Sequence, residues 1–418
     1  MFDNQDIIQE LKRSTIYEVN LRQYTPEGTI AAFMPHLVRL KEMGIDILWF
    51  MPIHPIGIKN RKGSLGSYYC SRDFTELNPE YGSKAELKAL IDQAHALGMK
   101  VILDWVANHA AWDNVWTIDH PEYFQRDEQG NFLSPYDWTD VIQIDHQNEA
   151  AHDALREAMC YWIREFDIDG FRADLAHLTP LHFWIKARHQ TEAIKPGLIW
   201  LAETETPAYY QAFDIFYAWK WMHATEHFCK NDHAVHDLKH ALHELKNGCP
   251  QQALQLFFTS NHDENTWNGT EFEKYGIFAK ALSVFSFYYP HAVPLIYSGQ
   301  EIPNTQRLQF FDKDELDWSH VAAYAGFYSI LCKHRKKINL SDDLEFIDGH
   351  HRLLAFRRGE GDNVVWVFLN FSHHPIHHQL HVSRGNYRHV FSHEQHDNTD
   401  SLSIHLDPGG FVVIEKWS

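Results

Sequence analysis

The chain has 418 residues and a net charge of −19, with 37 Lys and Arg against 56 Asp and Glu. A chain of this length can bury a large core, and one large domain with a small one fits it best. The excess of negative charge would repel a phosphate backbone or an anionic lipid surface, so we expect neither nucleic acid nor membrane as a partner.

The N-terminus has neither the basic start nor the apolar stretch of a signal peptide. No run approaches the roughly 18 apolar residues of a membrane-spanning helix. The five cysteines are odd in number, scattered and without metal-binding spacing, so we expect free thiols. These features predict a cytoplasmic protein, unless a leader has been removed. None of the 31 His is assigned to a metal.

Short apolar runs alternate with amphipathic helical patterns over roughly the first 340 residues, which is typical of βα units and a parallel sheet. Strands are expected at Thr15–Leu21, Ile45–Pro52, Lys100–Trp105, Gly170–Leu175, Ile199–Glu203, Phe213–Tyr217, Gln255–Ser260 and Val293–Ser298. Helices are expected between them, at Ile30–Met43, Lys84–Leu97, Glu149–Glu165, His223–Lys246, Tyr275–Phe287 and Ser319–Lys337. Eight such units predict a (β/α)8 TIM barrel, whose active site lies where the strands end.

Two segments depart from this alternation. Residues 110–147 are too long for an ordinary βα loop and are rich in aromatic residues, including Trp112, Trp116 and Trp138. We expect them to form a short inserted domain B that acts as a lid beside the cleft. Residues 341–418 alternate as antiparallel strands do and predict a C-terminal β-sandwich, which leaves 1–109 and 148–340 for the barrel.

Four of the predicted strands end in a carboxylate. Asp104, Asp174, Glu203 and Asp263 each follow an apolar run, so the barrel would bring them to one rim. Desolvation at such a position should raise the pKa of Glu203, which suits a proton donor. Randomly placed carboxylates would not be expected to fall at the ends of four strands.

Arg172 stands two residues before Asp174, so in a strand both side chains project from the same face. A neighbouring guanidinium should depress the pKa of Asp174 and keep it ionised as a nucleophile. The alternative interpretation is a structural ion pair without catalytic meaning.

These segments resemble, in order and spacing, the signature regions of the α-amylase family of retaining glycoside hydrolases. The similarity covers roughly the whole chain, and the ordered set is specific although each motif alone is weak. The matching segments are Leu65–Phe74, Asp104–His109, Asp140–Asn148, Gly170–Asp174, Ala202–Glu203 and Asn261–Asp263.

The resemblance implies a role for each matching residue. Asp174 matches the nucleophile, Glu203 the general acid/base and Asp263 the third carboxylate, which grips hydroxyls of the sugar in subsite −1. The remaining matches bind that sugar or support the site: Arg172 holds the nucleophile, His109 and His262 hydrogen-bond the sugar, Tyr69 stacks on it, and Asp104 and Asn108 are supporting residues.

The implied activity is hydrolysis of α-1,4-glucosidic bonds in starch-like glucans or maltooligosaccharides through a covalent glycosyl-enzyme intermediate. A transglycosidase, or a member acting on α-1,6 bonds or disaccharides, is the alternative; a catalytically silent binding protein would not need all three carboxylates. Calcium-binding members use the asparagine as a ligand, but His177 and Leu178 depart from the usual Lys and His, and Glu205 replaces a common Trp. We therefore expect no required cofactor, with calcium possible.

Overall fold

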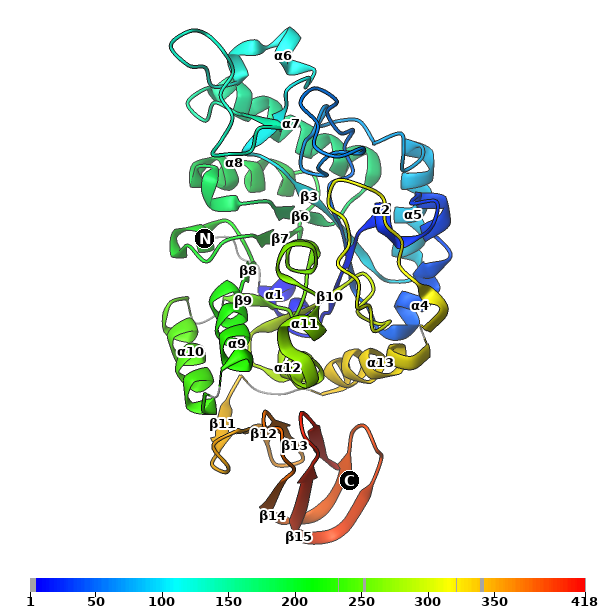
Figure 1. The fold of residues 1–418 in the computed structure, drawn as a ribbon, viewed down its shortest axis with the longest axis vertical. Helices are drawn as coiled ribbons and strands as arrows, with labels where there is room; N and C mark the ends of the chain where they lie inside the picture. Colours follow the sequence, from blue (N-terminus) through cyan, green and yellow to red (C-terminus); the bar gives the residue numbers. More distant parts are fainter. Residues whose placement is uncertain (1–4, 232, 251–252, 321, 339–341, 418) are drawn as a thin grey trace.

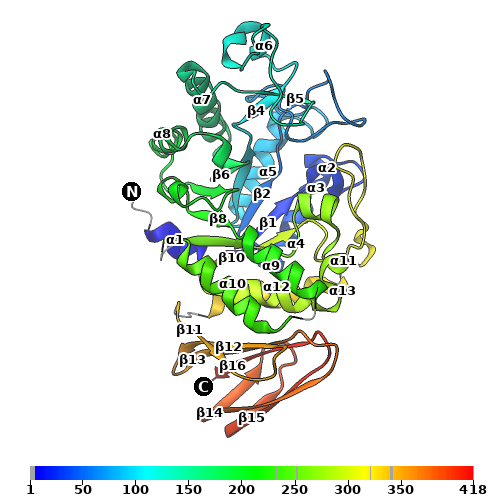
Figure 2. The same ribbon diagram turned by 60° about the vertical axis from the view of Figure 1, so that its left-hand side comes forward.

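The computed structural model describes residues 5–231, 233–250, 253–320, 322–338 and 342–417. It contains a closed barrel of parallel strands, a two-stranded sheet and a six-stranded antiparallel sheet. Both ribbon views place the C-terminal sheet at one end of the long axis and helix α6 (Trp116–Asp119), in the inserted segment, at the other (Figure 1, Figure 2). The barrel lies between them.

Eight parallel strands close the barrel in the order β1-β10-β9-β8-β7-β6-β3-β2 (Figure 1). Their bounds are β1 Ile16–Val19, β2 Ile47–Phe50, β3 Lys100–Trp105, β6 Gly170–Ala173, β7 Ile199–Ala202, β8 Ile215–Tyr217, β9 Leu254–Phe257 and β10 Ala292–Tyr297. Their residues are almost all buried, as strands covered on both faces require. Each predicted strand overlaps one of these eight, so the predicted barrel is confirmed.

The helices pack around this barrel (Figure 2). The α-helices are α1 Gln5–Leu11, α2 Leu21–Tyr24, α3 Ile30–Phe33, α4 His36–Met43, α5 Lys84–Ala96, α7 Glu149–Phe166, α8 Leu181–Glu192, α9 Trp219–Lys230, α10 Val235–Asn247, α11 Glu271–Tyr275, α12 Ala279–Tyr288 and α13 Ala322–Lys337. Short 3-10 helices lie at Pro121–Tyr123, Ala176–Leu178, Pro207–Gln211, Gly276–Phe278 and Trp318–His320, and a π-helix at Glu264–Asn268.

The helices differ from the predicted ones in two ways. The predicted helices Ile30–Met43 and His223–Lys246 are each divided, the first at Pro35, which lacks a backbone N–H, and the second at Asn231, which is extended. Helix α8 was not among the predicted helices. Its buried face includes Arg188, which is paired with Asp214, so the apolar periodicity is interrupted.

The inserted segment forms the antiparallel strands β4 (His109–Ala111) and β5 (Val141–Gln143), with α6 between them. Helix α7 begins directly afterwards because Oδ1 of Asn148 accepts hydrogen bonds from the N–H groups of the first turn. Nδ2 of Asn148 also donates to the carbonyl of Glu122 at 2.9 Å, which ties the helix start to the insertion. The predicted bounds of the insertion, 110 and 147, remain predictions.

The C-terminal strands form one sheet in the order β11-β12-β13-β16-β14-β15. Their bounds are β11 Leu344–Ile347, β12 Leu353–Glu360, β13 Asn363–Asn370, β14 Ile376–His389, β15 Gln395–Leu406 and β16 Phe411–Trp417. Alternate residues face opposite sides: Phe356 belongs to the barrel's core cluster, whereas Ala355 belongs to a separate cluster shared with β14 and β15. The predicted C-terminal antiparallel strands are therefore confirmed, and they are hydrogen-bonded into one sheet, whereas the prediction was a β-sandwich.

Two expectations from composition also bear on the fold. All five cysteines are free thiols in the structure, as predicted. Within the described residues, no helix is both long enough and apolar enough to cross a lipid bilayer.

Candidate active site

Arg172 lies at the centre of a buried network of carboxylates at the carboxyl end of the barrel. Its Nη1 donates to Oδ1 of Asp104 and to Oδ1 of Asp174, each at 2.9 Å. Its Nη2 lies 2.8 Å from Oε2 of Glu203. The side chains of Arg172 and Asp104 have no exposed surface. One guanidinium therefore joins the carboxylates of three strands, β3, β6 and β7.

This network places the predicted nucleophile and acid/base together. Asp174 follows the last residue of β6, and Glu203 follows the last residue of β7. The two strands are parallel neighbours, with Ala173 paired to Ala202. Because equivalent positions end adjacent parallel strands, both carboxylates leave the sheet at the same level.

Burial dominates the ionisation of both groups. It raises the pKa of Asp174 to about 7, although Arg172 opposes the rise, and the charges of Asp104 and Asp263 add to it. Burial likewise raises the pKa of Glu203 to about 7, again opposed by Arg172. The predicted rise for Glu203 agrees with this environment. The predicted depression for Asp174 is wrong, because several carboxylates share one cation in a desolvated site.

A strained backbone residue completes the environment of Glu203. The N–H of Leu175 donates to Oε2 of Glu203 at 2.9 Å. Leu175 has φ 40° and ψ 47°, a left-handed conformation that is costly for a branched side chain. The turn that ends β6 therefore carries Asp174 and also donates a hydrogen bond to Glu203 from the next residue.

His262 is bonded on both ring nitrogens. Its Nδ1 lies 2.5 Å from Oε1 of Glu18 on β1, and its Nε2 lies 3.2 Å from Oδ2 of Asp263. Burial opposes protonation of the ring, but Asp263 and Glu18 together hold the pKa of His262 well above its usual range. Burial also acts to raise the pKa of Asp263, yet attraction to His262 leaves it lowered. The site thus contains an imidazolium between two carboxylates.

Glu18 is the site residue that sequence reasoning missed. It lies within the buried strand β1, before the strand's last residue, and burial raises its pKa while His262 opposes that rise. A charged residue inside a fully buried four-residue strand was the available signal, because such a residue needs a partner.

Tyr69 connects the arginine network to His262. Its hydroxyl donates to Oδ2 of Asp104 at 3.0 Å and lies 2.7 Å from Nε2 of His262. The ring is 8% exposed and lies nearly parallel to the rings of His262 and Phe310, with centroids 5.3 and 6.3 Å away. Its place is therefore partly a core position, and the sugar-stacking role implied by the resemblance remains a prediction.

His109 and Asn108 lie on the side of the inserted segment. Burial lowers the pKa of His109 to about 4, so its ring is neutral at pH 7. Trp138 packs edge-on against His109, with ring centroids 5.5 Å apart. Of the other two lid tryptophans, Trp116 packs on Phe74 at 4.9 Å, and Trp112 donates from its indole to the carbonyl of Thr139. Trp138 is thus the lid tryptophan that contacts a predicted site residue.

The donor set around Asn108 does not fit calcium. Nε2 of Gln143 donates to Oδ1 of Asn108 at 2.9 Å and to its backbone carbonyl at 3.1 Å. The same nitrogen lies 3.5 Å from the carbonyl of Ile144. An amide nitrogen thus sits among the oxygens that a hard cation would need. The oxygens of Asn108 bind Gln143 of the inserted segment instead. Calcium independence remains a prediction.

The nine predicted site residues therefore divide into two groups. Seven form one connected set at the rim, and two lie beside it at the base of the insertion. The connected set is Tyr69, Asp104, Arg172, Asp174, Glu203, His262 and Asp263, and the flanking pair is Asn108 and His109. Chemically, this arrangement offers two carboxyl groups with raised pKa values beside a fixed cation, which suits nucleophilic attack combined with proton transfer.

Comparison with known proteins gives consistent matches. Residues 10–141 and 125–325 match the family described as alpha amylase, catalytic domain. A maltogenic alpha-amylase from Bacillus acidopullulyticus is 31% identical over 198 residues, which are 42% of this chain and 32% of that protein. The chain thus spans about a third of the length of that relative.

Two solved structures match over nearly the whole chain. An alpha-amylase from Lactobacillus plantarum superposes with a TM-score of 0.87 and 28% identity, covering 98% of this chain and 100% of the other. A noncanonic maltogenic alpha-amylase, AmyB from Thermotoga neapolitana, superposes with a TM-score of 0.86 and 30% identity, with the same coverage of 98% and 100%.

Proposed function

The chain belongs to the α-amylase family of glycoside hydrolases, and on that premise we propose that it is a retaining enzyme that cleaves α-1,4-glucosidic bonds in starch-like glucans or maltooligosaccharides. Its two working carboxylates are Asp174 and Glu203. The names of the similar proteins, which include maltogenic alpha-amylases, support this class of substrate.

One observation carries the proposal: a single guanidinium, that of Arg172, binds both Asp174 and Glu203. Retaining enzymes hold their two carboxyl groups about 5–5.5 Å apart, whereas inverting enzymes need about 6.5–9.5 Å to admit a water molecule. Two carboxyls on adjacent nitrogens of one guanidinium favour the shorter separation. This favours direct attack by a carboxylate over attack by water.

In the first step, Oδ2 of Asp174 attacks the anomeric carbon, since Oδ1 is held by Arg172. Glu203, protonated in its buried environment, gives its proton to the departing glycosidic oxygen. The products are a free glucan end and a glycosyl ester on Asp174. In the second step, Glu203 takes a proton from water, which attacks the anomeric carbon and releases Asp174.

The remaining residues bind the reacting sugar in this proposal. Asp263 and His262 grip its hydroxyl groups as a carboxylate and an imidazolium, and His109 binds as a neutral ring. Tyr69 orients Asp104 and His262 through its hydroxyl. These contacts strengthen as the sugar flattens toward an oxocarbenium ion.

The proposal is tested by following hydrolysis of maltoheptaose by proton NMR, with product time courses on soluble starch, pullulan and cyclodextrin. We expect the first new reducing end to have the α configuration and starch and maltoheptaose to be cleaved. A first product of β configuration would refute retention. Cleavage of pullulan at α-1,6 bonds alone would refute the proposed linkage, and longer oligosaccharides as main products would indicate a transglycosidase instead.

A further inference from the structure

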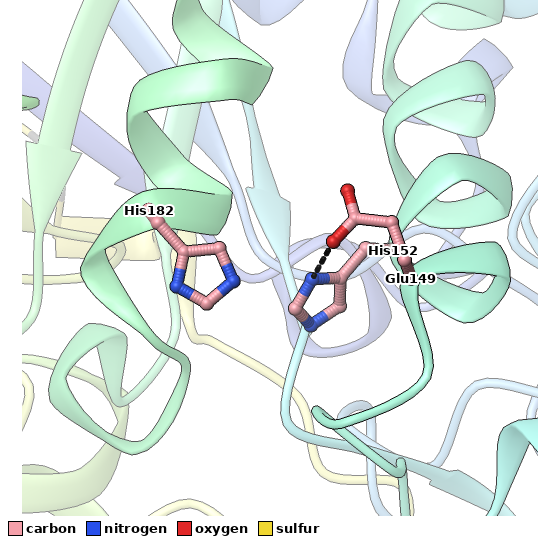
Figure 3. Close-up of side chains that lie close together, drawn as sticks. All are labelled: Glu149, His152 and His182. Carbon is pink, nitrogen blue, oxygen red and sulfur yellow. Dashed lines mark ion pairs between the residues drawn. The ribbon is translucent and has the colours of Figure 1, made fainter.

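A second group of titratable side chains lies outside the site described above, where helices α7 and α8 begin. Glu149 and His152 are on the first turns of α7, and His182 is on the first turn of α8 (Figure 3). One donor atom from each residue lies within 4.8 Å of the other two. Figure 3 shows the His182 ring facing the His152 ring from the neighbouring helix, and a dashed line joins the Glu149 carboxylate to a nitrogen of the His152 ring.

His152 is the central residue of this group. Its side chain has no exposed surface, and its Nδ1 has no hydrogen-bond partner. The nearest carboxylate oxygen, Oε2 of Glu149, is 3.8 Å away, which is too far for a hydrogen bond. A buried nitrogen without a partner costs stability, so its presence between a carboxylate and a second imidazole needs an explanation.

A third histidine contacts the other ring nitrogen of His152. Nδ1 of His146, which follows β5, lies 3.1 Å from Nε2 of His152. If Nε2 of His152 donates this bond, Nδ1 of His152 carries the lone pair that points toward Glu149. Histidine ligands of metal ions are usually held in this way, by an outer partner on the second ring nitrogen.

Glu149 retains one free oxygen for a ligand. Its Oε1 accepts from Lys186 at 2.7 Å and from Arg156 at 3.0 Å, and this pairing lowers the pKa of Glu149 to about 2. Asp153 also pairs with Arg156, so the four charged side chains balance. Oε2 of Glu149 lies 3.8 Å from Nδ1 of His152, and both cations are bonded to the other carboxylate oxygen.

We propose that Glu149, His152 and His182 form a binding site for a zinc-like divalent transition-metal ion, with His146 as the positioning residue behind His152. Two imidazoles and a carboxylate suit zinc and its neighbours and not calcium or magnesium. Ligand atoms of a tetrahedral zinc ion lie about 3.3 Å apart, so rotation of the exposed His182 and Glu149 side chains closes the site. A water molecule would take the fourth position.

The site would link three parts of the chain. His146 ends the inserted segment, α7 follows it, and α8 begins shortly after the turn that carries Asp174. A bound ion would therefore fasten the base of the lid to the helix that follows the nucleophile strand. This role is separate from glycoside hydrolysis, because none of the four residues belongs to the active-site network.

The test is spectroscopic titration of the full chain, freed of metal by a chelator, with Co²⁺ as the probe and Zn²⁺ as competitor. We expect about one equivalent of tetrahedral Co²⁺, displaced by Zn²⁺, and a Zn²⁺-dependent rise in Tm. His182→Ala, at an exposed position, should remove the tetrahedral spectrum and weaken Zn²⁺ binding at least about tenfold. His182→Cys should instead add a sulfur-to-cobalt charge-transfer band.

The matched control is His396→Ala, because His389, Glu394 and His396 form the other group of metal-ligand type among the described residues. The control should keep the tetrahedral spectrum and the Tm shift. The proposal is wrong if His182→Ala retains both, if His182→Cys gives no sulfur band, or if the wild-type chain gives no tetrahedral Co²⁺ spectrum.

Discussion

Nδ1 of His262 lies 2.5 Å from Oε1 of Glu18, and both side chains are buried. The two residues come from β1 and from the segment after β9, 244 positions apart in the chain. Together with Asp263, Glu18 raises the pKa of a ring that burial alone would keep neutral. It therefore decides which hydrogen bonds His262 can offer to a sugar.

Replacing Glu18 tests this relationship. Glu18→Gln removes the negative charge, so the pKa of His262 falls, and the alkaline limb of the kcat/KM profile moves to lower pH. We expect kcat/KM at pH 7 to drop about tenfold. Nitrogen NMR of the His262 ring checks the protonation state directly. Glu271→Gln, another buried glutamate, is the control; an unchanged His262 resonance in Glu18→Gln would contradict the pairing.

An α-glucosyl fluoride as substrate distinguishes the roles of Asp174 and Glu203, because its fluoride leaving group departs with little help from an acid. Glu203→Gln should form the glycosyl-enzyme and then stall, because its second step lacks a base. Asp174→Asn should form no adduct at all. Mass spectrometry of the intact proteins measures both outcomes. A sugar adduct on Asp174→Asn would reverse the assignment of the nucleophile.

Stability should depend on pH through Asp174. Its pKa is about 7 when folded against 3.8 as a reference, so the folded state holds the extra proton between these values. The wild type then loses stability as pH rises from about 4 to about 7. Asp174→Asn, which resembles the protonated form, should be more stable by about 1–3 kcal/mol at pH 8 and equal near pH 4.

Urea unfolding at several pH values measures this difference. Asp92→Asn, at an exposed position paired with Lys88, serves as the control and should show no such trend. If Asp174→Asn were less stable than the wild type at pH 8, then attraction to Arg172 would outweigh burial.

We expect neither the stability nor the activity of this protein to depend on calcium. Gln143 already supplies donors to the oxygens of Asn108, so Ca²⁺ added after chelation should change neither Tm nor kcat/KM. Gln143→Leu removes the donor from Oδ1 of Asn108, whereas the N–H of Ile144 still donates to the backbone carbonyl of Asn108, and the change should cost about 1–3 kcal/mol. Thermal unfolding with and without Ca²⁺ is the measurement, and restoration of chelated wild type by Ca²⁺ would show the expectation wrong.

The hydroxyl group of Tyr69 should contribute to catalysis. Tyr69→Phe keeps the ring but removes the link between Asp104 and His262, and we expect kcat/KM to fall about 10–100-fold. Tyr68→Phe is the matched control, since that buried ring lies under Arg22 instead, 4.0 Å from its guanidinium carbon. Equal kinetics for the two variants would remove Tyr69 from the site.

The sequence by itself determined the barrel and the residues at its rim. Apolar runs and helical periodicity are local signals, and all eight barrel strands carry them. Strand ends then place Asp174 and Glu203 together, because parallel strands of a closed barrel end on one rim. The small departures, such as the interruption of α8 by Arg188, occur where a polar residue is buried through a distant partner.

Only the tertiary structure decided the electrostatics. The pKa of Asp174 depends on how completely water is excluded and on how many carboxylates share Arg172. The local sequence around Arg172 and Asp174 indicates neither. The partnership of Glu18 with His262, the place of Gln143 beside Asn108 and the meeting of His152 with His182 are likewise long-range contacts. Such contacts arise from the packing of separate elements, which local periodicity does not encode.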